Sequence, residues 1–487
     1  MHLVRSPAAM LLAALLFGVA GQQLFFARAA GVNVLLATTL LLAIGWWLRP
    51  RERRPDIADS WLPVGALAFA VLCMIRADPA LLAFDFVSAG ALAAAWFAAL
   101  GGARITRLEM RAVLAEAADL IAGAIDRPIR LARESAGPIT QQARSRAGRL
   151  ARYVGGVALA IPFLIVFSVL FASADPVYAR RVNDFVEIWR DLFRDTGPRL
   201  VLFFATAWLA AAALSKLARA PLSHAASGSR GRVAAETSTV LLASVDLLFA
   251  AFVALQIGYL FGGRDTIDAA GIPYSAYARR GFFELIGSAG LVGALLFGVS
   301  LQARARSRAT TALGLMLVVL TLVILGSAWY RLDLYQLAYG WTELRFYALA
   351  GIVFLALSLL ILGWCTVSHS MQYALQPLVG AALLVALGVN VLSPSAFVAR
   401  ADLQRLIDPS TLPSDAERRM DPAYLVSLGD GAFPVIVELL PTLRWEDGQL
   451  LGAWLHWTAR GRAGGQDPWE SYNVDRSRAR EALGALP

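Results

Sequence analysis

Apolar runs of about twenty residues recur along this chain of 487 residues, and they limit its fold more than any other sequence feature. Each run is long enough, or nearly so, to cross about 30 Å of hydrocarbon as an α-helix. Because the interior of a bilayer offers no water to backbone N–H and C=O groups, only helices and closed barrels can span it. The runs far exceed the strands of about ten alternating residues that form a barrel. The sequence therefore predicts an all-α, polytopic transmembrane helical bundle.

Composition agrees with this prediction, since 58% of the residues are hydrophobic and only 16% are charged, whereas about a quarter of the residues in a soluble domain are charged. The apolar runs predict about eleven spans, at 7–26, 31–48, 61–75, 80–100, 153–173, 200–217, 238–261, 281–301, 310–329, 346–366 and 374–392. The first run also fits a signal peptide, because Arg5 precedes it and Ala27-Arg28-Ala29 resembles a cleavage site. Its retention therefore stays open.

Arginine predicts the orientation, because basic loops resist translocation across the membrane. Of the 44 basic residues, 21 fall in four segments that alternate along the predicted topology, at 49–54, 101–152, 216–237 and 302–310. The opposite loops carry 12 basic residues, which ten acidic residues nearly balance. We predict that the N-terminus is cytoplasmic and that eleven spans leave the C-terminus extracytoplasmic.

The predicted spans divide the chain into four regions, which are spans one to four at 1–100, a cytoplasmic Arg-rich amphipathic segment at 101–152, spans five to eleven at 153–392 and a tail at 393–487. A helix is predicted at 103–125, and Pro128 and Pro138 are expected to interrupt the Arg-rich stretch after it. We expect segment 101–152 to lie on the anionic inner leaflet, where each arginine contributes about 1 kcal/mol. It lacks the aromatic interleaving of a nucleic-acid site, so no nucleic-acid partner is predicted.

The tail is predicted to be a small helical extracytoplasmic module. Its candidate helices lie at 395–407, 421–428, 430–440, 446–461 and 475–484. Prolines and glycines mark the loops between these segments. Two roles remain open for the tail: a cap on the membrane bundle, or a docking surface for a protein partner.

Three acidic residues fall inside the predicted spans, and they are Asp85, Asp246 and Glu284. Buried carboxylates are costly in a membrane and usually face the protein interior or a water-filled path. Gln256 and Asn390 lie in the outer halves of their spans, which suggests a polar cavity open to the outside. Asp246 is the deepest acid and is the candidate ion or proton site of a transporter. The structural alternative is that these groups join helices by hydrogen bonds.

Residues 329–350, WYRLDLYQLAYGWTELRFYALA, are unusually dense in aromatic and charged side chains, and we call them the aromatic segment. Eight residues follow the pattern RL-x-LY-x-x-x-YG-[LW]-T-x-LR, namely Arg331, Asp333, Tyr335, Tyr339, Gly340, Thr342, Glu343 and Arg345. On these residues the chain resembles the bacterial membrane family catalogued as domain of unknown function 4173, which is related to unknown-function family 4153.

The resemblance extends into the tail at 390–405, 421–439 and 467–483, and covers about the last two thirds of the chain. The tail departs from the family at Asp402, near which asparagine is expected, and at Tyr472, where tryptophan is expected. The resemblance implies a polytopic membrane protein, and we predict the bacterial inner membrane as its location. It implies no reaction, ligand or catalytic residue.

The aromatic segment has two physical interpretations. Thr342 is a candidate N-cap, with Gly340 permitting the preceding turn, so the segment could be a rigid hairpin anchored by interfacial aromatic residues. Alternatively, four side chains at the mouth of the cavity could bind an anionic or sugar-like ligand, and these are Arg331, Arg345, Tyr335 and Tyr339.

Catalytic motifs are absent from the sequence, which contains no phosphate loop, HExxH, GxSxG or dinucleotide fingerprint. The four histidines are isolated, and the two cysteines are predicted near opposite faces of the membrane. No catalytic residue, metal site or cofactor is predicted. The span layout resembles that of lipid-linked sugar transferases, but the first external loop at 27–30 carries Arg28 and no acid.

Three functional hypotheses arise from the sequence. The leading one is an inner-membrane protein that binds, transports or senses a small polar solute through an outward-facing polar cavity. The second is a scaffold that recruits partners through its tail and its Arg-rich segment. The third is a membrane-embedded transferase, which lacks its most characteristic acidic group.

Overall fold

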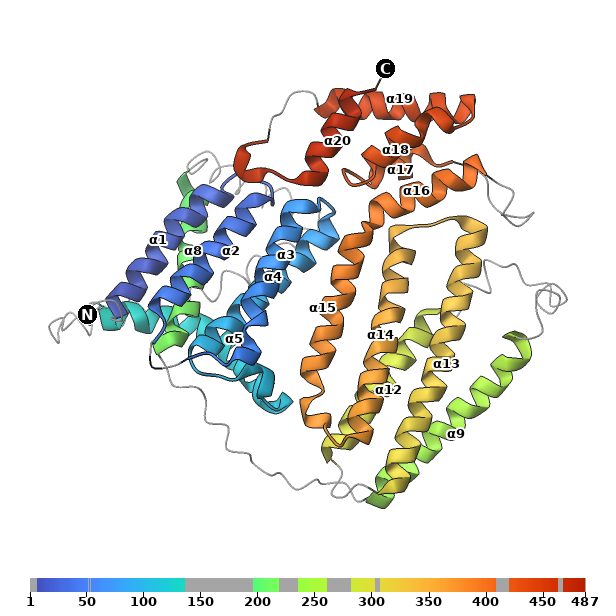
Figure 1. The fold of residues 1–487 in the computed structure, drawn as a ribbon, viewed down its shortest axis with the longest axis horizontal. Coiled ribbons are helices and arrows are strands. Elements are labelled where there is room, and N and C mark those ends of the chain that lie inside the picture. Colours follow the sequence, from blue (N-terminus) through green and yellow to red (C-terminus); the bar gives the residue numbers. More distant parts are fainter. Residues whose placement is uncertain are drawn as a thin grey trace, which may run out of the picture.

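The computed structural model describes residues 7–50, 52, 54–135, 196–218, 235–260, 282–302, 307–408, 420–462 and 467–486, and this part of the chain contains helices and no strand (Figure 1). The long helices are α1 Pro7–Phe25, α2 Val32–Leu48, α3 Trp61–Ile75, α4 Pro79–Leu100, α5 Met110–Ser135, α8 Thr196–Leu214, α9 Ala235–Leu260, α12 Phe282–Gln302, α13 Arg308–Tyr339, α14 Glu343–Val367 and α15 Leu375–Leu392. The tail helices are α16 Pro394–Ile407, α17 Pro422–Ser427, α18 Phe433–Leu439, α19 Trp445–Arg462 and α20 Val474–Gly484. Short 3-10 turns connect them, at η2 Ile57–Asp59, η3 Ile105–Arg107, η4 Ser215–Ala218, η5 Met371–Tyr373, η7 Leu440–Thr442 and η8 Trp469–Ser471.

Observed helices coincide with ten of the predicted spans, while the span predicted at 153–173 lies outside the described residues. Within the described part, eight helical segments are long and apolar enough to cross a membrane. They include the helices α1, α3, α4, α8, α9, α13, α14 and α15. The apolar stretches of α2 and α12 are shorter, at Val32–Leu48 and Leu285–Ser300. The chain is therefore a multi-pass membrane protein, and the total of eleven spans stays a prediction.

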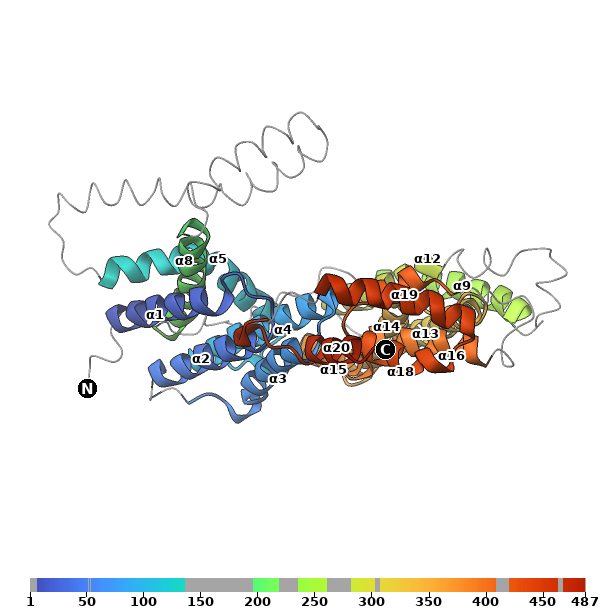
Figure 2. The same ribbon diagram turned by 90° about the horizontal axis from the view of Figure 1, so that it is seen from above.

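The membrane helices form two bundles that α15 joins (Figures 1 and 2). Helices α1, α2, α3, α4 and α8 share one apolar core, to which Phe69 and Phe97 contribute fully buried rings. Helices α9, α12, α13 and α14 share a second core around Leu317 and Leu325. Leu387 of α15 packs against the first core, whereas the same helix also contacts α14 of the second bundle. We refer to these groups as the first and second bundles.

The tail helices cover one end of both bundles (Figure 1), and we call this the tail end. They match the five predicted tail helices within a few residues. Their own apolar core includes Phe433, Leu451 and Leu455, each with 0% of its surface exposed. Helix α20 contacts α3 of the first bundle, and α16 contacts α14 of the second. The tail therefore bridges the two bundles.

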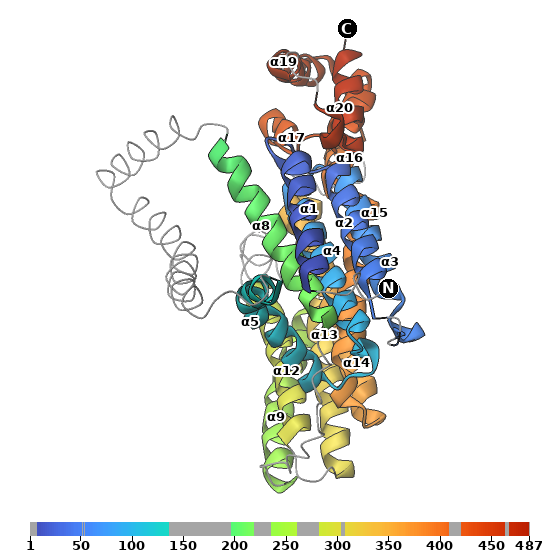
Figure 3. The same ribbon diagram turned by 90° about the vertical axis from the view of Figure 1, so that its left-hand side faces the viewer.

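Helix α5 crosses the opposite end of the first bundle, where it packs against α1 and α8 (Figure 3). The sequence predicted an interruption at Pro128, and this was wrong, because α5 continues through it to Ser135. Proline has no N–H to donate to the carbonyl of Ala124, four residues earlier. The Nε1 of Trp208 on α8 donates to that carbonyl oxygen at 2.7 Å instead. A contact between distant segments thus compensates the internal proline.

Four charged side chains are gathered between α5 and the end of α8. Lys216, the only lysine in the chain, lies with its Nζ 2.6 Å from Asp119 Oδ2 and also forms an ion pair with Glu116. Arg127 pairs with the same Asp119 carboxylate, and its side chain is only 1% exposed. Burial raises the pKa of Asp119, but Lys216 and Arg127 outweigh burial and hold that pKa below its ordinary value. The two ion pairs of Lys216 join α5 to the first bundle, whereas the Arg127–Asp119 pair lies within α5.

Replacing Lys216 with methionine tests this attachment. Glu116 is 2% exposed, so removal of its counter-charge leaves a buried carboxylate uncompensated. We expect Lys216→Met to lower the free energy of unfolding by about 3–5 kcal/mol. The control is Arg107→Met, which removes a pair whose arginine is 62% exposed and should cost less than about 1 kcal/mol. Denaturant unfolding in detergent measures both, and equal losses would contradict the account.

Candidate functional site between the helix ends and the tail

The aromatic segment consists of two helix ends and a tight turn, not of a loop. Helix α13 continues ten residues beyond the predicted end of its span and stops only at Gly340, where φ is +78°. The predicted span ended at residue 329 because the apolar run ends there. The helix continues because no glycine or proline occurs between that residue and Gly340. Thr342 caps the next helix as predicted, with its Oγ1 accepting from the N–H of Arg345 at 3.3 Å. The turn is therefore Gly340–Thr342.

Three predicted site residues meet beside this turn. The guanidinium carbon of Arg345 lies 4.2 Å from the centre of the Tyr335 ring, and the rings of Tyr335 and Tyr339 are 5.0 Å apart. Arg345 also donates to the carbonyl oxygens of Tyr339, at 3.3 Å, and of Gly340. Helix α13 ends with these carbonyls unpaired by its own backbone. Arg345 therefore stabilises the helix end on which both tyrosines lie.

Tail residues complete the other side of the turn, and they were not among the predicted site residues. The Oδ1 of Asp402 accepts from the N–H of Trp341 at 2.7 Å, and the hydroxyl of Tyr424 accepts from the N–H of Glu343 at 3.0 Å. The Nη1 of Arg405 donates to the carbonyls of Gln336 and Leu337, at 2.8 and 2.9 Å. The tail thus binds the backbone at both helix ends.

A cavity of about 350 Å³ lies where these groups converge. Predicted residue Tyr339 lies on its wall, whereas Arg331 is partly buried on α13 and does not line it. The lining residues are Tyr339, Gly340, Trp341, Thr342, Asp402, Arg405, Leu406, Met420, Asp421, Tyr424 and Leu425. The wall therefore combines a carboxylate, a guanidinium, phenol groups and apolar surface. This mixture suits a small polar ligand.

Burial shifts the pKa values of two charged side chains on the cavity wall, Asp402 and Arg405. Burial raises the pKa of Asp402 to about 6, although the N–H of Trp341 and the charges of Arg405 and Arg345 oppose the rise. Burial likewise lowers the pKa of Arg405, against the attraction of Asp402. A carboxyl group with this pKa changes its charge near neutral pH. The Asp402 carboxyl on the cavity wall can therefore be neutral or negative beside the Arg405 guanidinium.

A second polar contact joins two more predicted residues. The Nδ2 of Asn390 on α15 donates to the Oδ1 of Asp85 on α4 at 2.9 Å, and both side chains are 0% exposed. The contact lies where α15 meets the first bundle. It confirms neither ligand binding nor transport, but it shows that these two predicted side chains face each other between helices.

The tail is also hydrogen-bonded to the first bundle. The Nδ2 of Asn473 donates to the carbonyls of Cys73 and Arg76, at 3.1 and 2.8 Å, at the end of α3. Arg76 forms an ion pair with Asp475 at 3.5 Å. The N–H of Val32 donates to the carbonyl of Tyr472 at 2.9 Å. The tail therefore binds the ends of helices in both bundles.

Asp246 does not line the cavity. Asp246 is 2% exposed on α9, on the same face as Leu242 and Val253, which belong to the core of the second bundle. Its carboxylate oxygens have no hydrogen-bond partner among the described residues. The side chains of Gln256 and Glu284 lie outside the described part of the structure.

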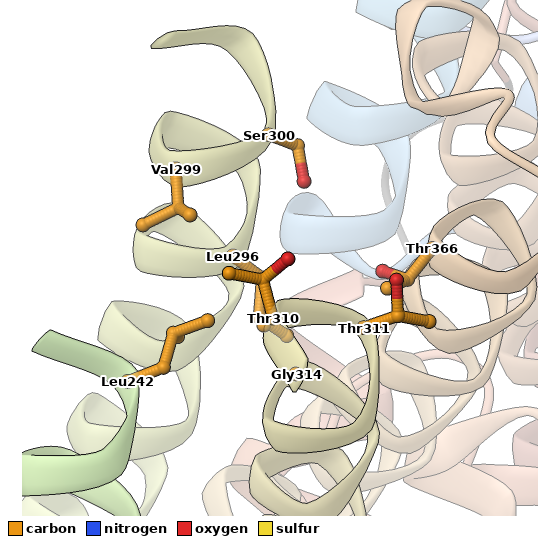
Figure 4. A pocket seen from close by; sticks show the side chains of 8 residues that line it. All are labelled: Leu242, Leu296, Val299, Ser300, Thr310, Thr311, Gly314 and Thr366. Atoms are coloured by element: carbon orange, nitrogen blue, oxygen red, sulfur yellow. The ribbon is translucent and has the colours of Figure 1, made fainter. Parts of the chain in front are cut away.

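Other cavities of the described structure lie apart from the turn, among them two with polar side chains on their walls. One, of about 30 Å³, lies in the second bundle near the end opposite the tail, and the hydroxyl-bearing side chains of Thr310 and Thr366 lie on its wall (Figure 4). It has room for about two water molecules. The other, of about 660 Å³, lies within the tail. Its Arg476 and Arg480 are already paired with Asp467, at 3.5 and 2.7 Å.

The fold and the apolar helices define a class, that of multi-pass helical membrane proteins. Within that class, the chain belongs to the family described as domain of unknown function (DUF4153), which matches residues 64–439, about three quarters of its length. The match is to this family and not to the related family 4173 that the aromatic segment predicted. Neither a search of curated proteins nor a search of solved structures found a match.

The raised pKa of Asp402 predicts a pH-dependent stability. The carboxyl group loses a proton less readily in the folded state, so its stabilising effect is complete below about pH 4 and disappears as the pH rises through about 6. Asp402→Asn keeps an acceptor for Trp341 but cannot ionise. We expect its free energy of unfolding, relative to wild type, to increase by on the order of 1–2 kcal/mol between pH 4 and pH 7.

Unfolding in detergent across this pH range measures the difference. Asp333→Asn, at an exposed position of α13, controls for the change from acid to amide. A constant difference between Asp402→Asn and wild type would contradict the raised pKa.

Proposed function

We propose that this membrane protein binds a small polar solute in the cavity between the Gly340–Thr342 turn and the tail. The observation that carries the proposal is the cavity of about 350 Å³ with Asp402, Arg405 and Tyr424 on its wall. The guanidinium can bind a carboxylate or phosphate, the carboxyl and phenol groups can bind hydroxyls, and the apolar wall can hold a ring. These groups favour a ligand with both an anionic group and hydroxyls.

The site favours sensing over transport. Asp402, Arg405 and Tyr424 line the cavity and also hold the ends of α13 and α14 by backbone hydrogen bonds. A ligand that engages these side chains competes with those bonds and changes how the tail binds the second bundle. In the transport hypothesis Asp246 is the ion site, but it lies in the second bundle core and not on the cavity wall.

We also propose the topology that arginine predicts. The protein has eleven spans in a bacterial inner membrane, including one at 153–173, with a cytoplasmic N-terminus and an extracytoplasmic tail. Helix α5 and the tail lie at opposite ends of the first bundle, which supports this arrangement. Exposed Arg104 and Arg133 can then contact the anionic leaflet, whereas Arg127 is buried in the ion-pair cluster. The finer assignment to family 4173 rests on the aromatic segment.

A specific observation favours the scaffold as second candidate. Helix α19 exposes Trp445, Trp457 and Leu450 by 77%, 72% and 50%. Buried aromatic residues dominate the binding energy of many protein interfaces, so exposed tryptophans on a tail suit the docking of a protein partner. This surface lies on the tail, apart from the cavity.

A thermal-shift screen of the purified protein against sugars, sugar phosphates, carboxylates and lipid head groups tests solute binding. A ligand at about 100 times its dissociation constant should stabilise the wild type by about 2.7 kcal/mol. We expect this stabilisation to be lost in Asp402→Asn and Tyr424→Phe. The stabilisation should persist in Arg400→Gln. Arg400 lies on α16, as Asp402 does, but it pairs with Glu438 at 3.1 Å and does not line the cavity.

The outcomes separate the two candidates. A hit that all variants retain would place the ligand elsewhere and contradict the proposal. A folded wild type that no compound stabilises would favour the scaffold.

A further inference from the structure

The contact between Asp85 and Asn390 leaves one oxygen on each side chain without a hydrogen bond to any described residue. The Nδ2 of Asn390 donates to Asp85 Oδ1 at 2.9 Å and to the carbonyl of Ala386 at 3.1 Å. Asp85 Oδ2 and Asn390 Oδ1 are both buried and have no hydrogen-bond partner in the described part of the chain. A buried acceptor without a hydrogen-bond partner destabilises the fold, and a charged one does so more strongly.

No base neutralises this carboxyl group within the described structure. Helices α2 and α15 carry no titratable side chain. The charged or titratable groups around Asp85 on the other neighbouring elements are Cys73, Arg76, Asp78 and Tyr347. Arg76 is the only base among them, and its guanidinium is bound to Asp475, at 3.5 Å, and to the carbonyl of Val391, at 3.3 Å. Arg76 attracts a negative charge on Asp85, and Asp78 repels it.

We propose that Asp85 and Asn390 form a proton-binding site in which Asp85 is a neutral carboxylic acid. The Oδ2–H of Asp85 donates to Asn390 Oδ1, while Asn390 Nδ2 donates to Asp85 Oδ1. One proton, taken up from water, thereby gives a partner to both oxygens that otherwise have none. It also removes a charge from a site that is 0% exposed between membrane helices.

The position of the pair gives the proton a structural role. Asp85 lies on α4 of the first bundle, and Asn390 lies on α15, which joins the second bundle. Loss of the proton places a carboxylate at this seam, close to Arg76, which now binds Asp475 of the tail. The proton therefore keeps α4 and α15 together and leaves Arg76 to the tail. This site does not depend on the proposed solute cavity.

Infrared difference spectroscopy of the purified, full-length protein tests the proposal. The spectrum of wild type minus Asp85→Asn at neutral pH should contain the C=O stretch of a protonated carboxylic acid. Two amides can exchange the same two hydrogen bonds, so this variant should fold. Asp246→Asn is the control, because Asp246 is also a buried acid within a membrane helix. This variant should retain the carboxylic acid band that we assign to Asp85. Raising the pH should remove the band from wild type.

A sodium ion between the two free oxygens is the competing explanation. Thermal unfolding of wild type in sodium chloride and in choline chloride, at equal ionic strength, distinguishes it. The proposal predicts equal melting temperatures in the two salts and the carboxylic acid band in wild type. It is overturned if wild type lacks the band, if Asp85→Asn retains it, or if sodium alone stabilises wild type but not Asp85→Asn.

Discussion

The ends of the membrane helices carry backbone N–H and C=O groups that the helices themselves cannot pair, and the tail supplies many of the missing partners. Among the described residues, four backbone N–H groups of the membrane helices and their turns donate to tail residues, and they belong to Val32, Ala77, Trp341 and Glu343. In the same part of the chain, six backbone carbonyls accept from tail side chains, and they belong to Ala30, Cys73, Arg76, Gln336, Leu337 and Ala338. Both bundles depend on these bonds, so the tail is part of the folded membrane unit and not an appendage to it.

This arrangement couples the cavity to the packing of the helices. The side chains on the cavity wall are the same side chains that bind the helix ends, because Asp402, Arg405 and Tyr424 have both roles. A bound solute can act only through its different affinity for alternative arrangements of the tail. The seam between Asp85 and Asn390 supplies a second place at which the bundles meet. Solute and proton would thus act on contacts between the same parts of the molecule.

Local sequence patterns predicted the helices well, since apolar runs, prolines and caps such as Thr342 act over a few residues. Contacts between distant segments were harder to predict. Asp85 and Asn390 were recognised because a polar group in an apolar run stands out, whereas Asp402 and Arg405 resemble the ordinary polar face of a surface helix. The continuation of α5 through Pro128 depends on Trp208, whose partner Ala124 lies 84 residues away in sequence, and no local pattern indicates such a contact.

Hydrogen exchange measured by mass spectrometry tests most directly whether the tail and the membrane helices form one unit. The informative peptides contain the N–H groups of Val32, Ala77, Trp341 and Glu343, together with peptides from α16 and α20. The account predicts that these four groups are protected and lose protection together with the tail helices as denaturant is added. Rapid exchange at the four groups while the tail stays protected, or exchange of the tail long before them, would contradict it.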